Sequence, residues 1–184
     1  MHSDLANIDL RNIDLIPATA GHQPLLSNLI QLYMHDFSAI VPIELGPDGR
    51  YEYPPLPLYW LEASRFPFLV AVGGKWAGFV FVRQAQSPEE EYPGWDMAEF
   101  FVLRRYRRHG IGTRLAHLAF KRFPGPWQIR VMESNAAAVQ FWRRAIEGFT
   151  GVSPSPTRST IEGAAWWTFR FESRSGALDG LSSG

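Results

Sequence analysis

The 184-residue sequence contains no cysteine, and this absence removes several kinds of chemistry at once. Disulfides, thiolate metal sites and cysteine nucleophiles all need that residue, so none of them is available to the chain. A chain without cysteine suits a reducing compartment, and the cytoplasm is therefore its expected location.

Net charge is also lacking, because 18 lysines and arginines balance 18 aspartates and glutamates. No overall field draws the chain to nucleic acid or to an anionic membrane surface, so neither is expected as a partner. No apolar run approaches the roughly 20 residues of a membrane span, and the first residues lack the basic and apolar stretches of a secretory signal.

The composition that is present, 46% hydrophobic and 14% aromatic residues, suits one globular domain with a sizeable core. We expect this single domain to occupy residues 1–173 and a flexible C-terminal tail to occupy residues 174–184.

The spacing of apolar residues predicts a mixed α/β fold in which strands and helices alternate. Strands are expected at 8–17, 68–72, 76–83, 96–103, 127–131 and 166–171. Helices are expected at 24–37, at 58–63, from 111 to just before Pro124, and from Asn135 onward. Loops are expected at 41–57, 84–93 and 153–160, and Gly73–Gly74 predicts a tight hairpin turn.

Two of these helices carry a recognisable apolar face. In the third helix Ile111, Leu115, Leu118 and Ala119 share one side, which we expect to be buried. In the fourth helix the expected buried stripe consists of Ala138, Phe141, Trp142, Ala145 and Ile146.

The turn after residue 103 concentrates positive charge in an otherwise neutral chain. Arginines stand at 104, 105, 107, 108 and 114, and Gly110 and Gly112 lie among them. Unpaired N–H groups at a helix start favour an anion, and glycine lets an oxygen approach the backbone. We therefore predict a phosphate site to which Arg107 or Arg108 adds charge-assisted bonds. Such turns also use glycine for its φ angle alone, so the glycines by themselves leave both interpretations open.

The better-known phosphate loops and hydrolytic motifs are missing. The dinucleotide fingerprint needs a glycine three residues after Gly112, where Leu115 stands, and Trp76 follows Gly74–Lys75 where a Walker loop needs Ser or Thr. There is no Gly-x-Ser-x-Gly elbow, and the histidines at 2, 22, 35 and 117 lack metal-ligand spacing. No metal is therefore expected.

Residues 107–112, Arg-Arg-His-Gly-Ile-Gly, resemble the Arg/Gln-x-x-Gly-x-Gly/Ala signature of the GNAT superfamily of N-acetyltransferases. Asn135, Ala138 and Phe141 match the spacing of the family's second signature, an Asn-x-x-Ala-x-x-Phe-Tyr helix. The order of expected elements from about residue 8 to residue 171 also resembles that of the family. The resemblance implies a GNAT-type mixed, mostly antiparallel central sheet flanked by helices.

The resemblance further implies that acetyl coenzyme A donates its acetyl group directly to a primary amine of a small molecule or peptide, in a ternary complex without metal. Backbone N–H groups of 109–113 would hold the pyrophosphate, and the main chain of 101–103 would pair with the pantetheine arm. The residues implied to bind the donor are Phe101, Val102, Leu103, Arg107, Arg108, His109, Gly110, Ile111, Gly112, Thr113, Asn135, Phe141 and Trp142. The absence of cysteine agrees with direct transfer, since no acyl-thioenzyme can form.

Two carboxylates on the preceding strand are candidates for the general base that makes the amine neutral. Glu99 lies three residues before Val102, and Asp96 lies three residues before Glu99. Either carboxylate can also face solvent or form a salt bridge, so the choice between them stays open. A backbone N–H of Phe101 or Val102 would stabilise the developing oxyanion.

The sequence departs from the family pattern at two places. Trp142 stands where the family usually has the tyrosine that acts as general acid, and an indole N–H donates without shuttling a proton, so the acid is unassigned. Gly148–Phe149 follows at a longer spacing than usual, so the fourth helix is expected to run on or to bulge.

These departures keep other functions open. A coenzyme-A-binding sensor or partner-binding domain without catalysis is the second interpretation, and a nucleic-acid module on the arginine turn is a third that zero net charge disfavours. Residues 37–60 are expected to form the acceptor wall, with Tyr51, Tyr53, Tyr59 and Trp60 available to line it. The acceptor and the oligomeric state, a homodimer included, stay open.

Overall fold

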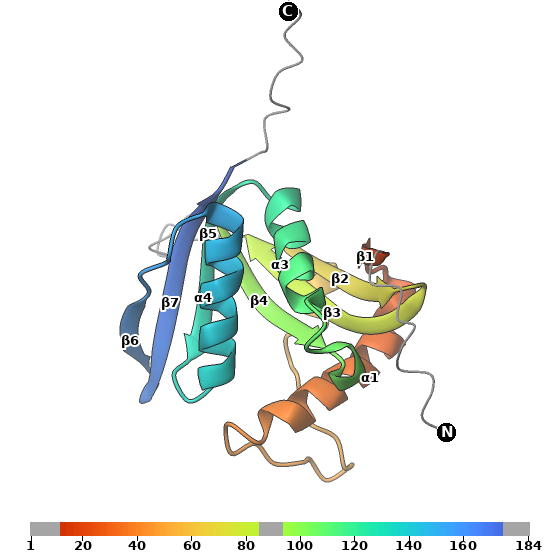
Figure 1. The fold of residues 1–184 in the computed structure, drawn as a ribbon. Coiled ribbons are helices and arrows are strands. Elements are labelled where there is room, and N and C mark those ends of the chain that lie inside the picture. The colour runs from red at the N-terminus through yellow and green to blue at the C-terminus, as the bar shows by residue number, and fades with distance from the viewer. Residues whose placement is uncertain (1–11, 85–93, 175–184) are drawn as a thin grey trace, which may run out of the picture.

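The computed structural model describes residues 12–84 and 94–174, and its strands form one seven-stranded sheet (Figure 1). The strands are β1 (Ile13–Pro17), β2 (Arg65–Val72), β3 (Lys75–Gln84), β4 (Trp95–Val102), β5 (Gly125–Met132), β6 (Thr157–Ile161) and β7 (Ala164–Ser173). Their order across the sheet is β1-β2-β3-β4-β5-β7-β6. Neighbours run antiparallel except β4 and β5, which run parallel. The predicted mixed, mostly antiparallel sheet flanked by helices is confirmed.

Helices cover both faces of this sheet. They are α1 (Gln23–Phe37), α2 (Leu58–Leu61), α3 (Ile111–Arg122) and α4 (Ala136–Thr150), with short 3₁₀ turns η2 (Ala20–His22) and η3 (Arg104–Tyr106). Figure 1 shows α3 and α4 side by side on the near face. The buried residues form two clusters, a larger one that includes α3 and α4 and a smaller one that includes α1 and α2.

Strand β3 shows why the core divides in this way. Phe79 and Phe81 belong to the α1/α2 cluster, while Val80 and Val82 belong to the α3/α4 cluster. Successive side chains of a strand point to opposite faces, and both faces are covered, so β3 is apolar almost without interruption.

The structure corrects the expected edges of several elements. Residues 157–160 were expected within a loop, but 157–161 form the edge strand β6. Its side chains are all exposed, so the strand lacks the apolar alternation that would predict it. Leu118 is 39% exposed, because the buried arc of α3 runs through Ala116 and Phe120 and leaves Leu118 at its border. Helix α2 ends at Leu61, two residues earlier than expected, and Gln84 closes β3.

Helix α4 runs unbroken through Gly148 to Thr150, so the prediction that it runs on is confirmed. The expected tail at 175–184, most of the expected loop at 84–93 and the first residues of the expected strand at 8–17 lie outside the described residues.

Strands β4 and β5 stay together for two residue pairs, Trp95 with Trp127 and Asp96 with Gln128, and then diverge. Beyond that point no strand among the described residues pairs with the edge of β4 that would face β5. This divergence opens the sheet next to the start of α3 and of α4.

A bulge in β4 decides which side chains face which helices. Glu99 lies opposite Phe81 and Met97 lies opposite Val82, so Ala98 is an extra residue between them. Met97 and Phe100 pack with the α3/α4 cluster, whereas Ala98 and Glu99 both face the α1/α2 side. Counted back from Phe101, alternation places Glu99 on the α1/α2 side, and the bulge changes the face of the residues before it, so that Met97 packs with the α3/α4 cluster.

Candidate active site

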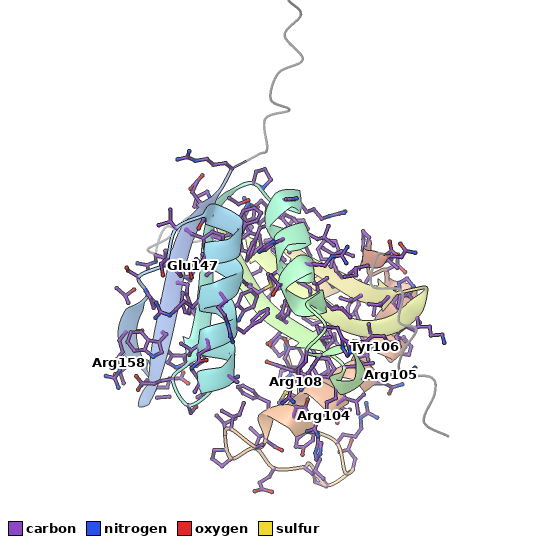
Figure 2. All side chains as sticks on the ribbon, viewed as in Figure 1. Arg104, Arg105, Tyr106, Arg108, Glu147 and Arg158 are labelled. Carbon is purple, nitrogen blue, oxygen red and sulfur yellow. The ribbon has the colours of Figure 1, made fainter. Side chains whose placement is uncertain are left out.

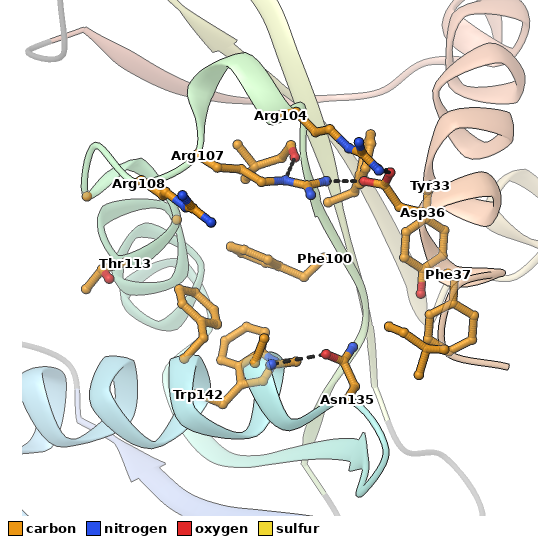
Figure 3. Close-up of a pocket in the computed structure, with 18 residues that line it drawn as sticks. Tyr33, Asp36, Phe37, Phe100, Arg104, Arg107, Arg108, Thr113, Asn135 and Trp142 are labelled. Atoms are coloured by element: carbon orange, nitrogen blue, oxygen red, sulfur yellow. Dashed lines mark hydrogen bonds and ion pairs between the residues drawn. The ribbon is translucent and has the colours of Figure 1, made fainter.

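A pocket of about 620 Å³ lies beside the free edge of β4, between the end of α1 and the starts of α3 and α4 (Figure 3). It is called the cleft below. From α1 and the following segment it takes Tyr33, Asp36, Phe37 and Ile40; from β4 and the turn, Phe100, Phe101, Val102, Arg104, Arg107, Arg108 and Gly110; from α3, Gly112 and Thr113; and from the start of α4, Asn135, Ala137, Ala138, Phe141 and Trp142.

Most of the residues implied to bind the donor line this cleft. They are Phe101, Val102, Arg107, Arg108, Gly110, Gly112, Thr113, Asn135, Phe141 and Trp142. Leu103, His109 and Ile111 do not line it: Ile111 is buried, His109 is exposed, and Leu103 packs against both core clusters.

The main chain of β4 presents alternate residues to the cleft. The N–H of Leu103 donates to the carbonyl of Ala77 on β3 at 2.8 Å, so the backbone groups of Leu103 and Phe101 face β3. By the same alternation those of Val102 and Phe100 face the cleft. Of the segment 101–103, Val102 is therefore the residue whose backbone can meet a ligand there.

The turn before α3 leaves its first N–H groups unpaired within the helix. The first helical bond of this turn runs from the N–H of Arg114 to the carbonyl of Gly110, so the N–H groups of residues 111–113 have no helical acceptor. Gly110 caps the helix with φ 74°, in the left-handed region that favours glycine. An added Cβ at Gly112 would lie 3.1 Å from the Phe141 ring, so this glycine also lets α4 pack closely.

The three arginines of the turn that line the cleft fall into two groups (Figure 3). Arg104 and Arg107 are both bound to Asp36 of α1, at 2.6 and 2.5 Å, and the Nε of Arg107 donates to the Val102 carbonyl at 2.6 Å. Arg108 has no hydrogen bond or ion pair within the described residues and extends into the cleft. Arg108 is therefore the guanidinium that is free to meet an anion.

Asp36 is charged under ordinary conditions because of these partners. Partial burial works to raise the pKa of Asp36, but the hydrogen bonds from Arg104 and Arg107 outweigh it and lower the pKa below its usual value. The carboxylate thus joins the last turn of α1 to the turn between β4 and α3.

Glu99 lies between two phenols on the α1/α2 side. Its Oε2 accepts from the Tyr33 hydroxyl at 2.6 Å and its Oε1 from the Tyr53 hydroxyl at 2.9 Å. Burial raises the pKa of Glu99 in spite of these two bonds, and the charge of Asp96 adds to the rise. A carboxylate with a raised pKa is better matched to a general base working near neutral pH.

The tyrosines around Glu99 resist ionisation. Burial and then the charge of Glu99 raise the pKa of Tyr33 well above its usual value, and the same causes raise the pKa of Tyr53. They also raise the pKa of Tyr59 to about 12. Tyr33 and Tyr53 therefore act as neutral donors to Glu99.

Asp96 occupies a different environment at the point where β4 and β5 part. It is 3% exposed, and its Oδ2 accepts from Arg83 of β3 and from Arg130 of β5, both at 2.8 Å. Asp96 does not line the cleft. The structure thus places this carboxylate between two guanidinium groups and Glu99 between two phenols.

Trp142 is 5% exposed and forms part of the aromatic wall of the cleft. Its ring packs edge-on against Phe100 and Phe141, with centroids 5.0 and 4.9 Å apart. Asn135 uses its Oδ1 to accept from the N–H of Ala138 at 3.1 Å and so caps α4. The cap fixes the end of α4 that faces the cleft.

Tyr33 and Asp36 are among the cleft residues that were not predicted as site residues from the sequence. Both lie in an ordinary amphipathic helix, where Tyr33 and Phe37 have the spacing of core positions. No local motif connects residue 33 with residue 99, so their contact follows from tertiary packing.

No group of His, Asp or Glu suited to a metal ion occurs in the part of the chain that the structure describes. Among residues 12–84 and 94–174, no helix is both long and apolar enough to cross a membrane.

The sheet opens beside a cationic helix start, with a half-buried carboxylate close by, and this α/β arrangement is one that supports acyl transfer. The chain matches the family model of the acetyltransferase (GNAT) family over residues 26–147, and it belongs to that family. No curated protein matches the sequence significantly.

Solved structures with the same fold cover nearly the whole domain. An acetyltransferase from Thermus thermophilus is 19% identical with a TM-score of 0.63, over 88% of this chain and 97% of that one. NAA60 of Arabidopsis thaliana, in complex with a bisubstrate analogue, is 18% identical with a TM-score of 0.58, over 88% and 98%. Spermidine N-acetyltransferase from Vibrio cholerae, with CoA and spermine, is 10% identical with a TM-score of 0.64, over 89% and 96%. At these identities the likeness shows the fold alone.

Proposed function

We propose that the protein is an N-acetyltransferase that moves an acetyl group from acetyl coenzyme A to a primary amine of a small molecule or peptide. Transfer is direct, within a ternary complex, without a metal, and takes place in the cytoplasm. The observation that carries this proposal is the position of Glu99, a carboxyl of raised pKa bonded to a tyrosine that lines the cleft.

The residues of the cleft fit the donor. Its phosphates would meet the unpaired N–H groups of residues 111–113 and the free guanidinium of Arg108. The backbone of Phe100 and Val102 offers the free strand edge along which the pantetheine arm would lie. Bound there, the donor supplies an activated acetyl thioester.

Amine acylation requires a neutral amine, a donor to the developing oxyanion and a leaving thiolate, and groups of the chain can provide for each. Glu99 takes up the proton of the acceptor ammonium and leaves a neutral amine. The N–H of Val102, which faces the cleft, donates to the oxygen of the acetyl group as negative charge develops there. A thiolate with an unperturbed pKa of about 8.5 leaves without a strong acid, so Trp142 serves as a packing residue.

The solved relatives support an amine acceptor. One is a spermidine N-acetyltransferase in complex with CoA and spermine, and another is NAA60 in complex with acetyl-CoA. Asp96, bound to two arginines, is proposed as a support for the fold and Glu99 as the base.

The test is a thiol-release assay with acetyl coenzyme A against polyamines, amino acids, aminoglycosides and peptides. We expect turnover with at least one amine, and a loss of kcat of about 10²-fold or more in Glu99→Gln with the Kd for acetyl coenzyme A little changed. Glu147→Gln is the matched control, because Glu147 is exposed on α4 outside the cleft (Figure 2). Equal activity of Glu99→Gln and Glu147→Gln would contradict the assignment of the base.

A coenzyme-A-binding domain without catalysis remains the second candidate, and the tryptophan at position 142 favours it. Its signature would be a raised Tm with coenzyme A, by mass action, and no thiol release with any amine.

A further inference from the structure

Tyr33 both lines the cleft and donates a hydrogen bond to Glu99. It lines the cleft (Figure 3), and its hydroxyl lies 2.6 Å from Oε2 of Glu99. Neither Glu99 nor Tyr53 is among the residues that line the cleft. A substrate in the cleft therefore meets the phenol before it meets the carboxylate.

The Tyr33 ring is held firmly in this orientation. It packs edge-on against Phe79 and Phe101, with centroids 5.8 and 5.7 Å away, and stacks on Phe37 at 5.8 Å. The 2.6 Å separation of the two oxygens is in the short range typical of a hydrogen bond to a carboxylate. The geometry is thus fixed for a proton to pass between them.

We propose that Tyr33 is a catalytic residue that relays the proton of the acceptor amine to Glu99. This inference rests on the proposed function and names the group that touches the amine. The phenol oxygen accepts a hydrogen bond from the amine, and the phenol hydrogen already points to Glu99.

Each bond that breaks in the relay is matched by a bond that forms. An N–H bond of the ammonium breaks as its proton joins the Tyr33 oxygen, and the Tyr33 O–H bond breaks as its proton joins Oε2 of Glu99. The nitrogen keeps the electron pair, which forms the C–N bond to the acetyl carbon. The electron pair of the broken C–S bond leaves with sulfur, which is protonated as the amide nitrogen loses its second proton. Glu99 afterwards releases its proton to solvent.

The two protons must move together. Burial and the charge of Glu99 raise the pKa of Tyr33 well above its usual value, so a separate tyrosinate would be costly. In a concerted step the phenol is neutral before and after, and the net change is the protonation of Glu99. The raised pKa of that carboxyl favours the change.

The chain offers a matched pair of variants to test the relay. Tyr33→Phe and Tyr53→Phe each remove one phenol from Glu99, but Tyr33→Phe alone removes a group that lines the cleft. We expect Tyr33→Phe to lower kcat by about 10²-fold and Tyr53→Phe to lower it far less. Combining Tyr33→Phe with Glu99→Gln should cost no more than Glu99→Gln alone, because both act in one step.

A second measurement needs neither acetyl coenzyme A nor an amine. The infrared C=O band of protonated Glu99, identified by its loss in Glu99→Gln, reports the pKa of this carboxyl in the free protein. Tyr53, Tyr59 and Asp96 are the titratable groups that face Glu99 and Tyr33 from neighbouring elements, and each stays present in Tyr33→Phe. We expect both phenylalanine variants to raise this pKa to a similar extent, since each removes one donor to the carboxylate.

The wild-type protein supplies a test that does not depend on the folding of a variant. In mixtures of light and heavy water, a concerted relay gives a quadratic dependence of kcat on deuterium content, as two protons move together. A linear dependence, equal kcat in the two phenylalanine variants, or losses that multiply in the double variant would overturn the relay while leaving the proposed function standing. No thiol release by the wild-type protein with any amine would overturn both.

Discussion

Removal of Glu99 from water has two effects: it raises the pKa of this carboxyl, which suits a general base, and it lowers the stability of the folded protein when the carboxyl is charged. Desolvation raises its pKa, so the folded protein binds a proton at this carboxyl more readily than the unfolded chain does. Below the ordinary pKa of 4.5 both states are protonated and nothing is lost. As pH rises through the raised pKa, the charged form must be kept buried, and stability falls.

Glu99→Gln is therefore expected to raise the Tm at neutral pH while it lowers kcat. The glutamine carries no charge, so the gain should shrink as pH falls through the raised pKa of Glu99 toward 4.5. Differential scanning calorimetry of both proteins across this pH range measures the gap. A gap that stays constant, or that widens on acidification, would show that burial does not raise the pKa of Glu99.

Ion pairs of Asp36 join α1 to the turn between β4 and α3 beside the cleft. Asp36 holds Arg104 and Arg107, and Arg107 in turn binds the Val102 carbonyl and lies 5.5 Å over the Phe101 ring. A carboxylate in the lining of the cleft also opposes a polyanionic ligand. Asp36 thus orders the cleft and weakens its attraction for phosphate at the same time.

Asp36→Asn should tighten the binding of coenzyme A a few-fold and steepen its dependence on salt, because a negative charge leaves the cleft and two guanidinium groups lose their carboxylate partner. The loss of stability should be at most about 1 kcal/mol, since both arginines are partly exposed. Titration calorimetry at two ionic strengths measures both effects, with Glu147→Gln as a control of equal charge. Weaker binding in Asp36→Asn would mean that, for coenzyme A binding, the ordering of Arg104 and Arg107 by Asp36 matters more than the negative charge of Asp36.

The fold as a whole depends on the junction of β4 and β5. Two residue pairs join the strands, and Asp96 spans the junction by binding Arg83 of β3 and Arg130 of β5. The cleft lies beyond this point, so the ion pairs stand where the sheet begins to open.

Asp96→Asn is expected to destabilise the protein by about 1–3 kcal/mol, because two guanidinium groups lose a buried charged acceptor. The kcat of the folded variant should fall less than that of Glu99→Gln. Urea unfolding and the thiol-release assay measure the two effects. Glu133→Gln is the control, since the Glu133–Arg158 pair is exposed and should matter little (Figure 2). A large loss of kcat without loss of stability would return Asp96 to the role of a base.

Local patterns in the chain were enough to predict the order of strands and helices, the arginine-rich turn and most of the cleft lining. These features depend on residues close in sequence: apolar periodicity, a glycine of positive φ at position 110, and the spacing of Asn135 and Phe141. The exposed strand β6 escaped prediction because its residues carry no apolar alternation.

Contacts between distant segments decided the chemistry around Glu99. Glu99 lies on the same side of β4 as Phe101, and packing brings Tyr33 and Tyr53 to its two oxygens across 66 and 46 residues of chain. The same packing separates Glu99 from Asp96, which the sequence left as alternatives. A pKa depends on burial and on neighbouring charges, and both are set by the folded arrangement of segments that no local pattern connects.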